Sequence, residues 1–313
     1  MSNRDLTRRQ HFVPRIYQRG WTQARWSADA PADQDALWAY DLQGRRAFKT
    51  CPNGVLAANW FYERDADAPD NEIETSFRKD EAEYATTMRF MDFACSNALA
   101  IAREGAQESA AYVGRTFASY LQAFPEYLTT LKRFAALCYV RVPAAMNLKR
   151  NELVRNLNSA HLAEALTLPH KFLTFAREST LIDRFNGLSV QLWITLDADF
   201  VTSDRPCFDV DTSVSGYHPL SGYAIGRRND VIAMFPLSHR MLLLLIPTDL
   251  HVFGQLTSQS PSIRVVGKDA VRRVNSMIVN FAERWIIARE REEAIFDLRV
   301  WPVARPTSAR TPL

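Results

Sequence analysis

Two carboxylates and one arginine occupy positions that the surrounding sequence marks as apolar. If residues 72–103 form a helix, Glu74 and Glu81 share one face with Phe77, because a spacing of seven residues is about two helical turns. Arg141 falls on a similar apolar stripe of a later predicted helix. A buried charge without a partner is destabilising by several kcal/mol. We therefore expect Arg141 to pair with Glu74 or Glu81, either as a structural ion pair or as part of a site.

A second polar stretch, VTSDRP at residues 201–206, ends a predicted strand. Thr202, Ser203 and Asp204 are favourable turn or cap formers, so they could simply bond their own backbone. In the other interpretation, Asp204 points into a cleft as a carboxylate ligand or base, and the two hydroxyl groups act as hydrogen bonders. The sequence leaves both interpretations open.

The N-terminal stretch QHFVPRIYQRGW, residues 10–21, is both apolar and cationic. We expect its apolar side chains to pack on a bundle of helices and so to bring His11 and Arg15 to the carboxylates. Carboxylates and an imidazole suit a hard divalent ion such as Mg²⁺ or Mn²⁺, and arginines suit a phosphate. The predicted cluster consists of His11, Arg15, Glu74, Glu81, Arg141 and Asp204.

Other polar residues are expected to support this cluster. Asn275 and Asn280 lie among apolar residues of a predicted helix, where capping of a neighbouring backbone is the favoured role for an asparagine. Asn59 and Tyr62 belong to the aromatic stretch NWFY. His239, in the turn of a predicted hairpin, is expected to face solvent.

These residue types favour phosphodiester hydrolysis. A divalent metal would activate water, His11 would act as general base or ligand, and arginines would stabilise the anionic transition state. The lead hypothesis is a metal-dependent hydrolase, nuclease-like or nucleotide-directed, whose partner is a nucleic acid or a nucleotide. Its catalytic residues would be His11, Arg15, Arg141 and Asp204, and its metal ligands Glu74, Glu81 and Asp204.

Two other functions stay open. The first is a non-catalytic binding or interaction protein of a bacterial defence or toxin-type system, in which the same cluster is a buried structural network. The second is a cysteine-based transferase that uses Cys207. The chain contains no GxGxxG, Walker A, HExxH or GxSxG motif, so the common signatures of nucleotide binding and hydrolysis do not decide between them.

Composition narrows the class of protein. The net charge of +3 permits an acidic ligand. The sequence lacks the dense clusters of basic residues that are typical of nucleic-acid-binding domains. The four cysteines are far apart in the sequence and form no CxxC pair, which argues against structural zinc and a disulfide framework. The N-terminus is polar, and the longest apolar run, MLLLLIP, is too short to span a bilayer. We expect a cytoplasmic protein without a membrane partner.

The periodicity of apolar residues changes along the chain. Residues 37–50 predict a β-hairpin, helical patterns dominate about 72–182, and alternation typical of strands follows from about 188 to 300. The pattern at 268–292 predicts a long helix. We therefore predict an α+β fold in which an N-terminal helical bundle packs on a mainly antiparallel C-terminal sheet with one long C-terminal helix.

The same patterns predict one domain over residues 11–300. Its helical half covers about 11–185 and its sheet half about 186–300. Residues 1–10 and 304–313 are predicted to be flexible tails.

The motifs occur in a characteristic order: HFVPRIY, NWFY, two glutamates seven residues apart, RVP, TSDRP and FPLS. This order resembles that of a bacterial family catalogued as domain of unknown function 4238. Trp21 is a mild departure, because the family often has Phe there. The resemblance covers about residues 11–290 and implies a single α+β unit; it brings no established activity and no catalytic roles.

Overall fold

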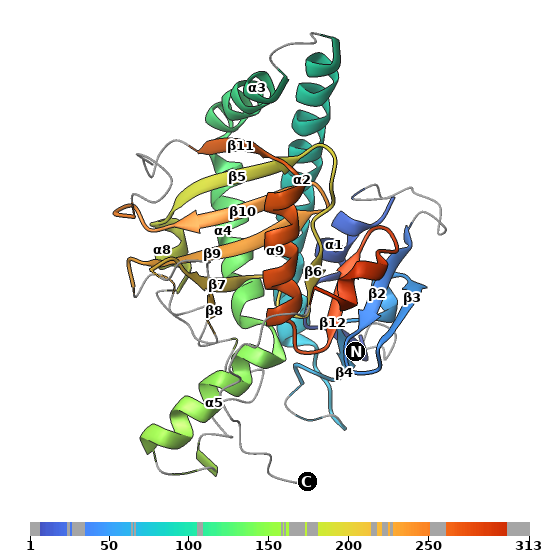
Figure 1. The fold of residues 1–313 in the computed structure, drawn as a ribbon. Coiled ribbons are helices and arrows are strands. Elements are labelled where there is room, and N and C mark those ends of the chain that lie inside the picture. The colour runs from blue at the N-terminus through green and yellow to red at the C-terminus, as the bar shows by residue number, and fades with distance from the viewer. Residues whose placement is uncertain are drawn as a thin grey trace.

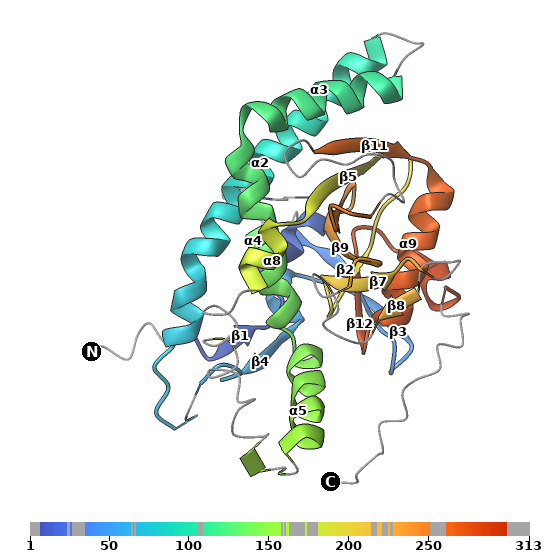
Figure 2. The same ribbon diagram turned by 90° about the vertical axis from the view of Figure 1, so that its left-hand side faces the viewer.

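The structure, a computed structural model, is built in layers around a β-sheet. Helices α2 (Glu72–Glu104) and α4 (Pro125–Val140) cover one face of the sheet, and α9 (Lys268–Phe281) covers the other (Figures 1 and 2). The structure describes residues 7–23, 26, 35–63, 65, 67–104, 109–157, 159, 161–162, 173, 181–213, 218–220, 225, 228–250 and 261–298.

Within the described residues, six strands form the larger sheet in the order β11-β5-β10-β9-β7-β8. Neighbouring strands are antiparallel except β11 and β5, which run parallel. The strands are β5 (Ser189–Thr195), β7 (Phe208–Asp211), β8 (His218–Leu220), β9 (Val231–Ser238), β10 (Met241–Ile246) and β11 (Ser262–Val266).

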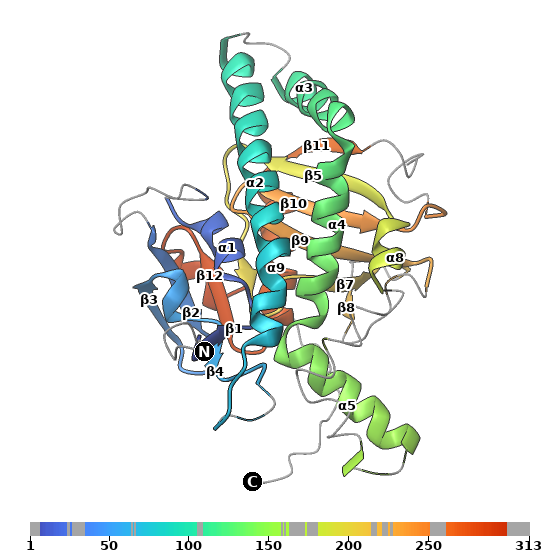
Figure 3. The same cartoon turned by 180° about the vertical axis from the view of Figure 1, so that it is seen from behind.

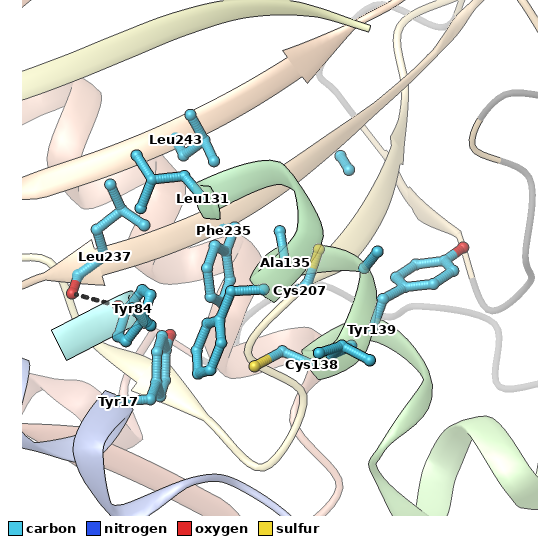
Figure 4. Packing of buried hydrophobic residues seen from close by; sticks show 14 of the residues in the cluster. Tyr17, Tyr84, Leu131, Ala135, Cys138, Tyr139, Cys207, Phe235, Leu237 and Leu243 are labelled. Atoms are coloured by element: carbon cyan, nitrogen blue, oxygen red, sulfur yellow. Dashed lines mark hydrogen bonds between the residues drawn. The ribbon is translucent and has the colours of Figure 1, made fainter. Parts of the chain in front are cut away.

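The two faces of this sheet belong to different hydrophobic cores. Along β10, Leu243 packs in the core under α2 and α4, whereas Leu242 packs in the core under α9. Successive side chains of a strand point to opposite faces, so a strand covered on both sides must be apolar throughout. This explains the unbroken run MLLLLI. Figure 4 shows part of the core under α2 and α4, with Tyr84 and Phe235 among its labelled side chains. In this core, Tyr84 of α2 stacks on Phe134 of α4 at 3.8 Å between ring centroids.

The smaller sheet joins the two ends of the chain. In the described part of the chain, its four strands follow the order β3-β2-β12-β6. They are β2 (Leu37–Asp41), β3 (Arg46–Thr50), β6 (Thr202–Ser203) and β12 (Trp285–Ala288). Strand β1 (Arg9–His11) pairs separately with β4 (Ala57–Asn59). The predicted hairpin at 37–50 is confirmed as β2 and β3.

The predicted arrangement of an N-terminal helical bundle on a C-terminal sheet is wrong. The helices of the bundle occupy the middle of the chain, about 72–157, and strands lie on both sides of them in the sequence. The central strand β12 pairs with β2 across more than two hundred residues. Local periodicity cannot reveal such pairing, and the pattern at 268–292, predicted as one helix, contains both α9 and β12.

Three further helices lie in the described part of the chain: α3 (Ser109–Ala123), α5 (Pro143–Leu157) and α8 (Leu181–Asn186). It also contains the 3-10 turns η3 (Pro52–Gly54) and η5 (Glu293–Phe296). A break before Pro143 separates α4 from α5, which extends away from the sheet (Figure 3).

The prediction that residues 11–300 form one domain stays a prediction. The tail residues 9 and 10 belong to β1, whereas 1–6 and 304–313 lie outside the described residues, as does most of 158–180.

The N-terminal segment packs against the sheet as well as the helices. Helix α1 (Arg15–Gln18) and the 3-10 turn η1 (Arg19–Trp21) bury Tyr17, whose ring stacks on Phe235 of β9.

The expectation that His239 faces solvent is wrong, because it is 1% exposed and its Nδ1 lies 3.1 Å from the carbonyl of Gly20. A Cβ at Gly20 would approach the carbonyl of Leu237 to 2.8 Å, so a glycine is needed at this contact.

Candidate functional site

Arg141 lies at the end of α4, where the chain turns into α5. Its backbone N–H donates to the carbonyl of Leu137, and Val142 precedes Pro143, whose ring disfavours a continued helix. The side chain is 2% exposed and points to α2, which runs beside α4 (Figure 3). The break in the helix therefore places a cation inside the helical layer.

The guanidinium of Arg141 contacts both predicted carboxylates. Its Nη1 donates to Glu81 Oε1 at 2.7 Å, and its Nη2 lies 3.6 Å from Glu74 Oε2. Phe77, which lies between the two glutamates on α2, stacks under the guanidinium at 3.9 Å. The predicted ion pair is confirmed, and it involves both glutamates because all three α2 residues lie on one helical face.

The contact between Arg141 and Glu74 is incomplete. A separation of 3.6 Å is too long for a hydrogen bond, and among the described residues neither Arg141 Nη2 nor Glu74 Oε2 has another hydrogen-bond partner. Burial raises the pKa of Glu74, an effect that the positive charge of Arg141 opposes. The Glu74 side chain is 18% exposed, although its Oε2 is itself buried.

Tyr62 connects Arg141 to the N-terminal strand. Arg141 Nε donates to the Tyr62 hydroxyl at 2.6 Å, and that hydroxyl donates to the carbonyl of His11 at 2.9 Å. The backbone N–H of Tyr62 donates to the side chain of Gln10 at 2.7 Å. We call His11, Tyr62, Glu74, Glu81 and Arg141 the arginine centre.

The imidazole of His11 has a defined tautomer. Its Nε2 lies 3.1 Å from the carbonyl of Pro52, which can only accept, so Nε2 carries the proton. Burial, followed by the positive charge of Arg15, lowers the pKa of His11 to about 4, and Arg141 and Arg9 add to this effect. The imidazole is therefore neutral near pH 7, and its Nδ1 is an acceptor.

Asp204 has a different environment. Its Oδ1 accepts from the N–H of Glu283 at 3.1 Å, and its Oδ2 accepts from the N–H groups of Arg284 and Trp285 at 2.7 and 3.0 Å. Burial raises the pKa of Asp204 to about 6, although these N–H groups lower it. The carboxylate thus fastens the start of β12 to the end of β6, and these hydrogen-bond partners lie at the smaller sheet rather than in the arginine centre.

The remaining predicted residues also bond nearby backbone or buried groups. Thr202 Oγ1 lies 2.7 Å from the Tyr17 hydroxyl, and Ser203 Oγ accepts from the N–H of Arg205. Asn275 holds the loop before β6, because it accepts from Val201 N–H and donates to the Asp199 carbonyl.

Asn280 Nδ2 donates to the Ser276 carbonyl within α9. Asn59 is exposed and pairs with Arg9 across β1 and β4.

The arrangement does not form a ready metal site. Among the residues that the structure describes, no group of three His, Cys, Asp or Glu side chains is placed to hold a metal ion. Arg141 Nη1 occupies the position beside Glu81 where an ion between the carboxylates would bind. Like charges repel, so a divalent ion there would have to displace the guanidinium.

Cys207 lacks the features of a reactive thiol. It is 3% exposed, and burial raises its pKa well above the ordinary value. Reactive cysteines instead have a lowered pKa and partial exposure.

Two residues that contact the arginine centre were not predicted from the sequence. Gln10 holds Tyr62, and Pro52 holds His11. Gln10 could have been predicted as a polar residue next to an apolar segment. Pro52 contributes only its backbone carbonyl, which leaves no signal in the sequence.

The fold and the arginine centre define an α+β protein whose helical layer encloses a buried cation paired with two carboxylates. Within that class, the chain belongs to the family described as "Protein of unknown function (DUF4238)", whose model matches residues 9–292. The family resemblance is thereby confirmed. Neither the curated proteins nor the solved structures contain a match to the chain. In the described part of the chain, every helix is too short or too polar to cross a membrane.

Proposed function

We propose that this protein binds a phosphate-bearing ligand, a nucleotide or a nucleic acid, where Arg15 adjoins His11 of the arginine centre. The observation that carries the proposal is the set of guanidinium groups near His11: the positive charges of Arg15, Arg141 and Arg9 add to the main effect of burial in lowering its pKa. A potential that disfavours an imidazolium favours an anion in the same place.

The two side chains offer complementary groups to such a ligand. Arg15 is exposed, and its guanidinium makes no hydrogen bond or ion pair with residues that the structure describes. A guanidinium of this kind can bind a phosphate through two parallel hydrogen bonds. The neutral His11 presents Nδ1, which can accept from a sugar hydroxyl or from a water. The pair therefore suits a phosphate next to a hydroxyl, as in a nucleotide.

Thermal unfolding of the full chain with a nucleoside monophosphate tests the proposal. Binding to the native state alone raises the midpoint with ligand concentration, by an amount equivalent to about 2.7 kcal/mol at 100 times Kd. We expect this rise in the wild type and in the control variant Arg264→Gln, which removes an exposed arginine from β11 of the larger sheet. We expect no rise in Arg15→Gln. An equal rise in Arg15→Gln, or none in the wild type, contradicts the proposal.

The second candidate function is metal-dependent phosphodiester hydrolysis. It is favoured by Nδ1 of His11, which has no hydrogen bond to the described residues and can accept a proton from an attacking water. Mg²⁺ or Mn²⁺ would use Glu74, whose Oε2 has no hydrogen bond to the described residues, and Glu81 after displacement of Arg141. Asp204, whose oxygens accept main-chain N–H groups of another region, would not join this pair. Arg15 and Arg141 would stabilise the anionic transition state.

Hydrolysis of bis(p-nitrophenyl) phosphate with Mn²⁺ tests this candidate. We expect His11→Gln to abolish turnover while the variant stays folded. A midpoint that rises with Mn²⁺ in the wild type and not in Glu81→Ala supports the metal. Turnover that is unchanged in His11→Gln refutes the role of this imidazole.

Without hydrolysis, the same site fits a non-catalytic binding protein, for which a bacterial defence or toxin-type system is our proposed setting. We place it in the cytoplasm, since Cys51, Cys95, Cys138 and Cys207 are all free thiols.

A further inference from the structure

The smaller sheet carries arginines stacked on aromatic rings. The guanidinium carbon of Arg46 lies 5.6 Å from the ring centroid of Phe48, and that of Arg284 lies 4.7 Å from Trp285. The two rings contact each other edge to face at 6.0 Å between centroids. We call Arg46, Phe48, Arg284 and Trp285 the β3 strip.

Strand register explains why the strip is continuous. Asp41 of β2 lies opposite both Arg46 of β3 and Trp285 of β12, so these three residues share one face. Ala39 lies opposite Phe48, and its small side chain lets Phe48 and Trp285 meet across β2. Lys49, the next residue along β3, faces the other side of the sheet.

Asp41 holds the arginines in place. Arg284 binds its carboxylate through Nε and Nη2 at 3.2 and 3.0 Å, and Arg46 Nε lies 3.5 Å away. The hydrogen bonds from Arg284 lower the pKa of Asp41 to about 2, even though burial raises it, so the carboxylate stays ionised. The side chains of Arg46 and Arg284 remain 65% and 44% exposed. Together with the exposed Arg45, they give the strip a positive charge.

The strip adjoins the site proposed above. Strand β3 ends at Thr50, and Pro52, whose carbonyl holds His11, follows directly in η3. In the described part of the chain, β3 has a neighbouring strand on one side only. At about 3.3 Å per residue, Phe48 and Arg46 lie about 13 and 20 Å along the chain from Pro52, a distance of a few nucleotides.

We propose that the β3 strip binds single-stranded nucleic acid and leads it to His11. Phe48 and Trp285 pack against the core but are only partly buried, so part of each ring can stack with a base. Such rings next to arginines that can pair with phosphates are the two features that single-strand-binding surfaces combine. An acidic polypeptide would use the arginines but not the rings. The inference rests on the proposed phosphate-ligand site only in stating that the strand leads to His11. Binding by the strip itself depends on different residues.

Fluorescence anisotropy with a labelled oligonucleotide of about 12 nucleotides tests the strip on the full chain. We expect Phe48→Leu to weaken binding about tenfold through lost stacking. Arg46→Gln should also weaken it, and should reduce the slope of log K against log salt by about 0.7. Lys49→Gln removes the same charge from the opposite face and should leave the affinity within about twofold of the wild type.

Four outcomes overturn the inference: no oligonucleotide binding by the wild type, equal losses in Arg46→Gln and Lys49→Gln, no loss in Phe48→Leu, or equal competition by polyglutamate. Arg46 is exposed, so its variant keeps the test valid even if Phe48→Leu fails to fold.

The nucleotide-dependent thermal shift separates the two proposals. If strip variants lose the oligonucleotide but keep the nucleotide shift, both sites stand. If the strip binds the oligonucleotide but a nucleotide does not raise the unfolding midpoint, only the proposed site at His11 is refuted.

Discussion

The arginine centre and the Asp204 turn are both buried charges that the sequence places in apolar surroundings, yet they differ in how their polar atoms are bonded. Both oxygens of Asp204 accept main-chain N–H groups. Arg141 Nη2 and Glu74 Oε2, by contrast, face each other at 3.6 Å without a hydrogen bond among the described residues. A carboxylate satisfied by backbone has a structural role, whereas an incompletely paired centre beside an exposed arginine can still gain from a ligand.

The largest expected effect comes from removing the cation of the arginine centre. Arg141→Leu leaves two carboxylates without their partner and should lower the free energy of unfolding by about 3–5 kcal/mol, measured by urea denaturation. Arg133 offers a matched control, since it also projects from α4 and pairs with Asp80 and Glu83 of α2, but is 31% exposed. Arg133→Leu should cost about 1 kcal/mol. Equal losses would mean that burial does not distinguish the two arginines.

The Asp204 turn should respond to a smaller chemical change. Asp204→Asn turns an amide group toward main-chain donors and should cost about 1–3 kcal/mol in the free energy of unfolding, measured in the same way. Ligand affinity at His11 should not change. A variant that loses ligand binding at full stability would place Asp204 in the site after all.

The pH dependence of stability should separate the two regions. The pKa of His11 falls from 6.5 to about 4 on folding, so the unfolded state takes up protons first and stability falls as pH decreases from about 6.5 to 4. This loss is about 2 kcal/mol at about pH 5. The pKa of Asp204 rises from 3.8 to about 6 on folding, so the folded state holds this proton more tightly. The contribution of Asp204 therefore has the opposite sign: stability falls as pH increases from about 3.8 to 6.

Urea denaturation across this pH range checks both contributions. His11→Gln should remove the loss on the acid side, and Asp204→Asn should make it steeper. If His11→Gln leaves the profile unchanged, the imidazole is not held neutral in the folded protein.

The smallest effect is expected for Glu74, in contrast to Glu81 of the same arginine centre. Glu74→Gln removes a carboxylate whose pKa is already raised and whose Oε2 lacks a hydrogen bond, so stability should change by less than about 1 kcal/mol. Glu81→Gln loses a charge-assisted bond of 2.7 Å and should cost about 1.5–3 kcal/mol. Chemical denaturation of the two variants side by side tests the order, and a reversed order would show that Glu74 is the principal partner of Arg141.

Features that depend on local periodicity could be predicted from the sequence. The helical repeat placed Glu74, Phe77 and Glu81 on one face, and the cost of burying charge then required a cation such as Arg141. Alternation and turn residues likewise predicted the hairpins β2–β3 and β9–β10.

Features that depend on distant segments were decided by the tertiary structure alone. β12 is a short strand that pairs with β2 and β6, and its sequence WIIA also fits the end of a helix. The partners of Asp204 and the burial of His239 follow from that pairing and from the packing of η1. Hydrogen-bond partners far along the chain leave no periodic signal in the sequence. The choice between a turn former and a ligand for Asp204 therefore required the fold.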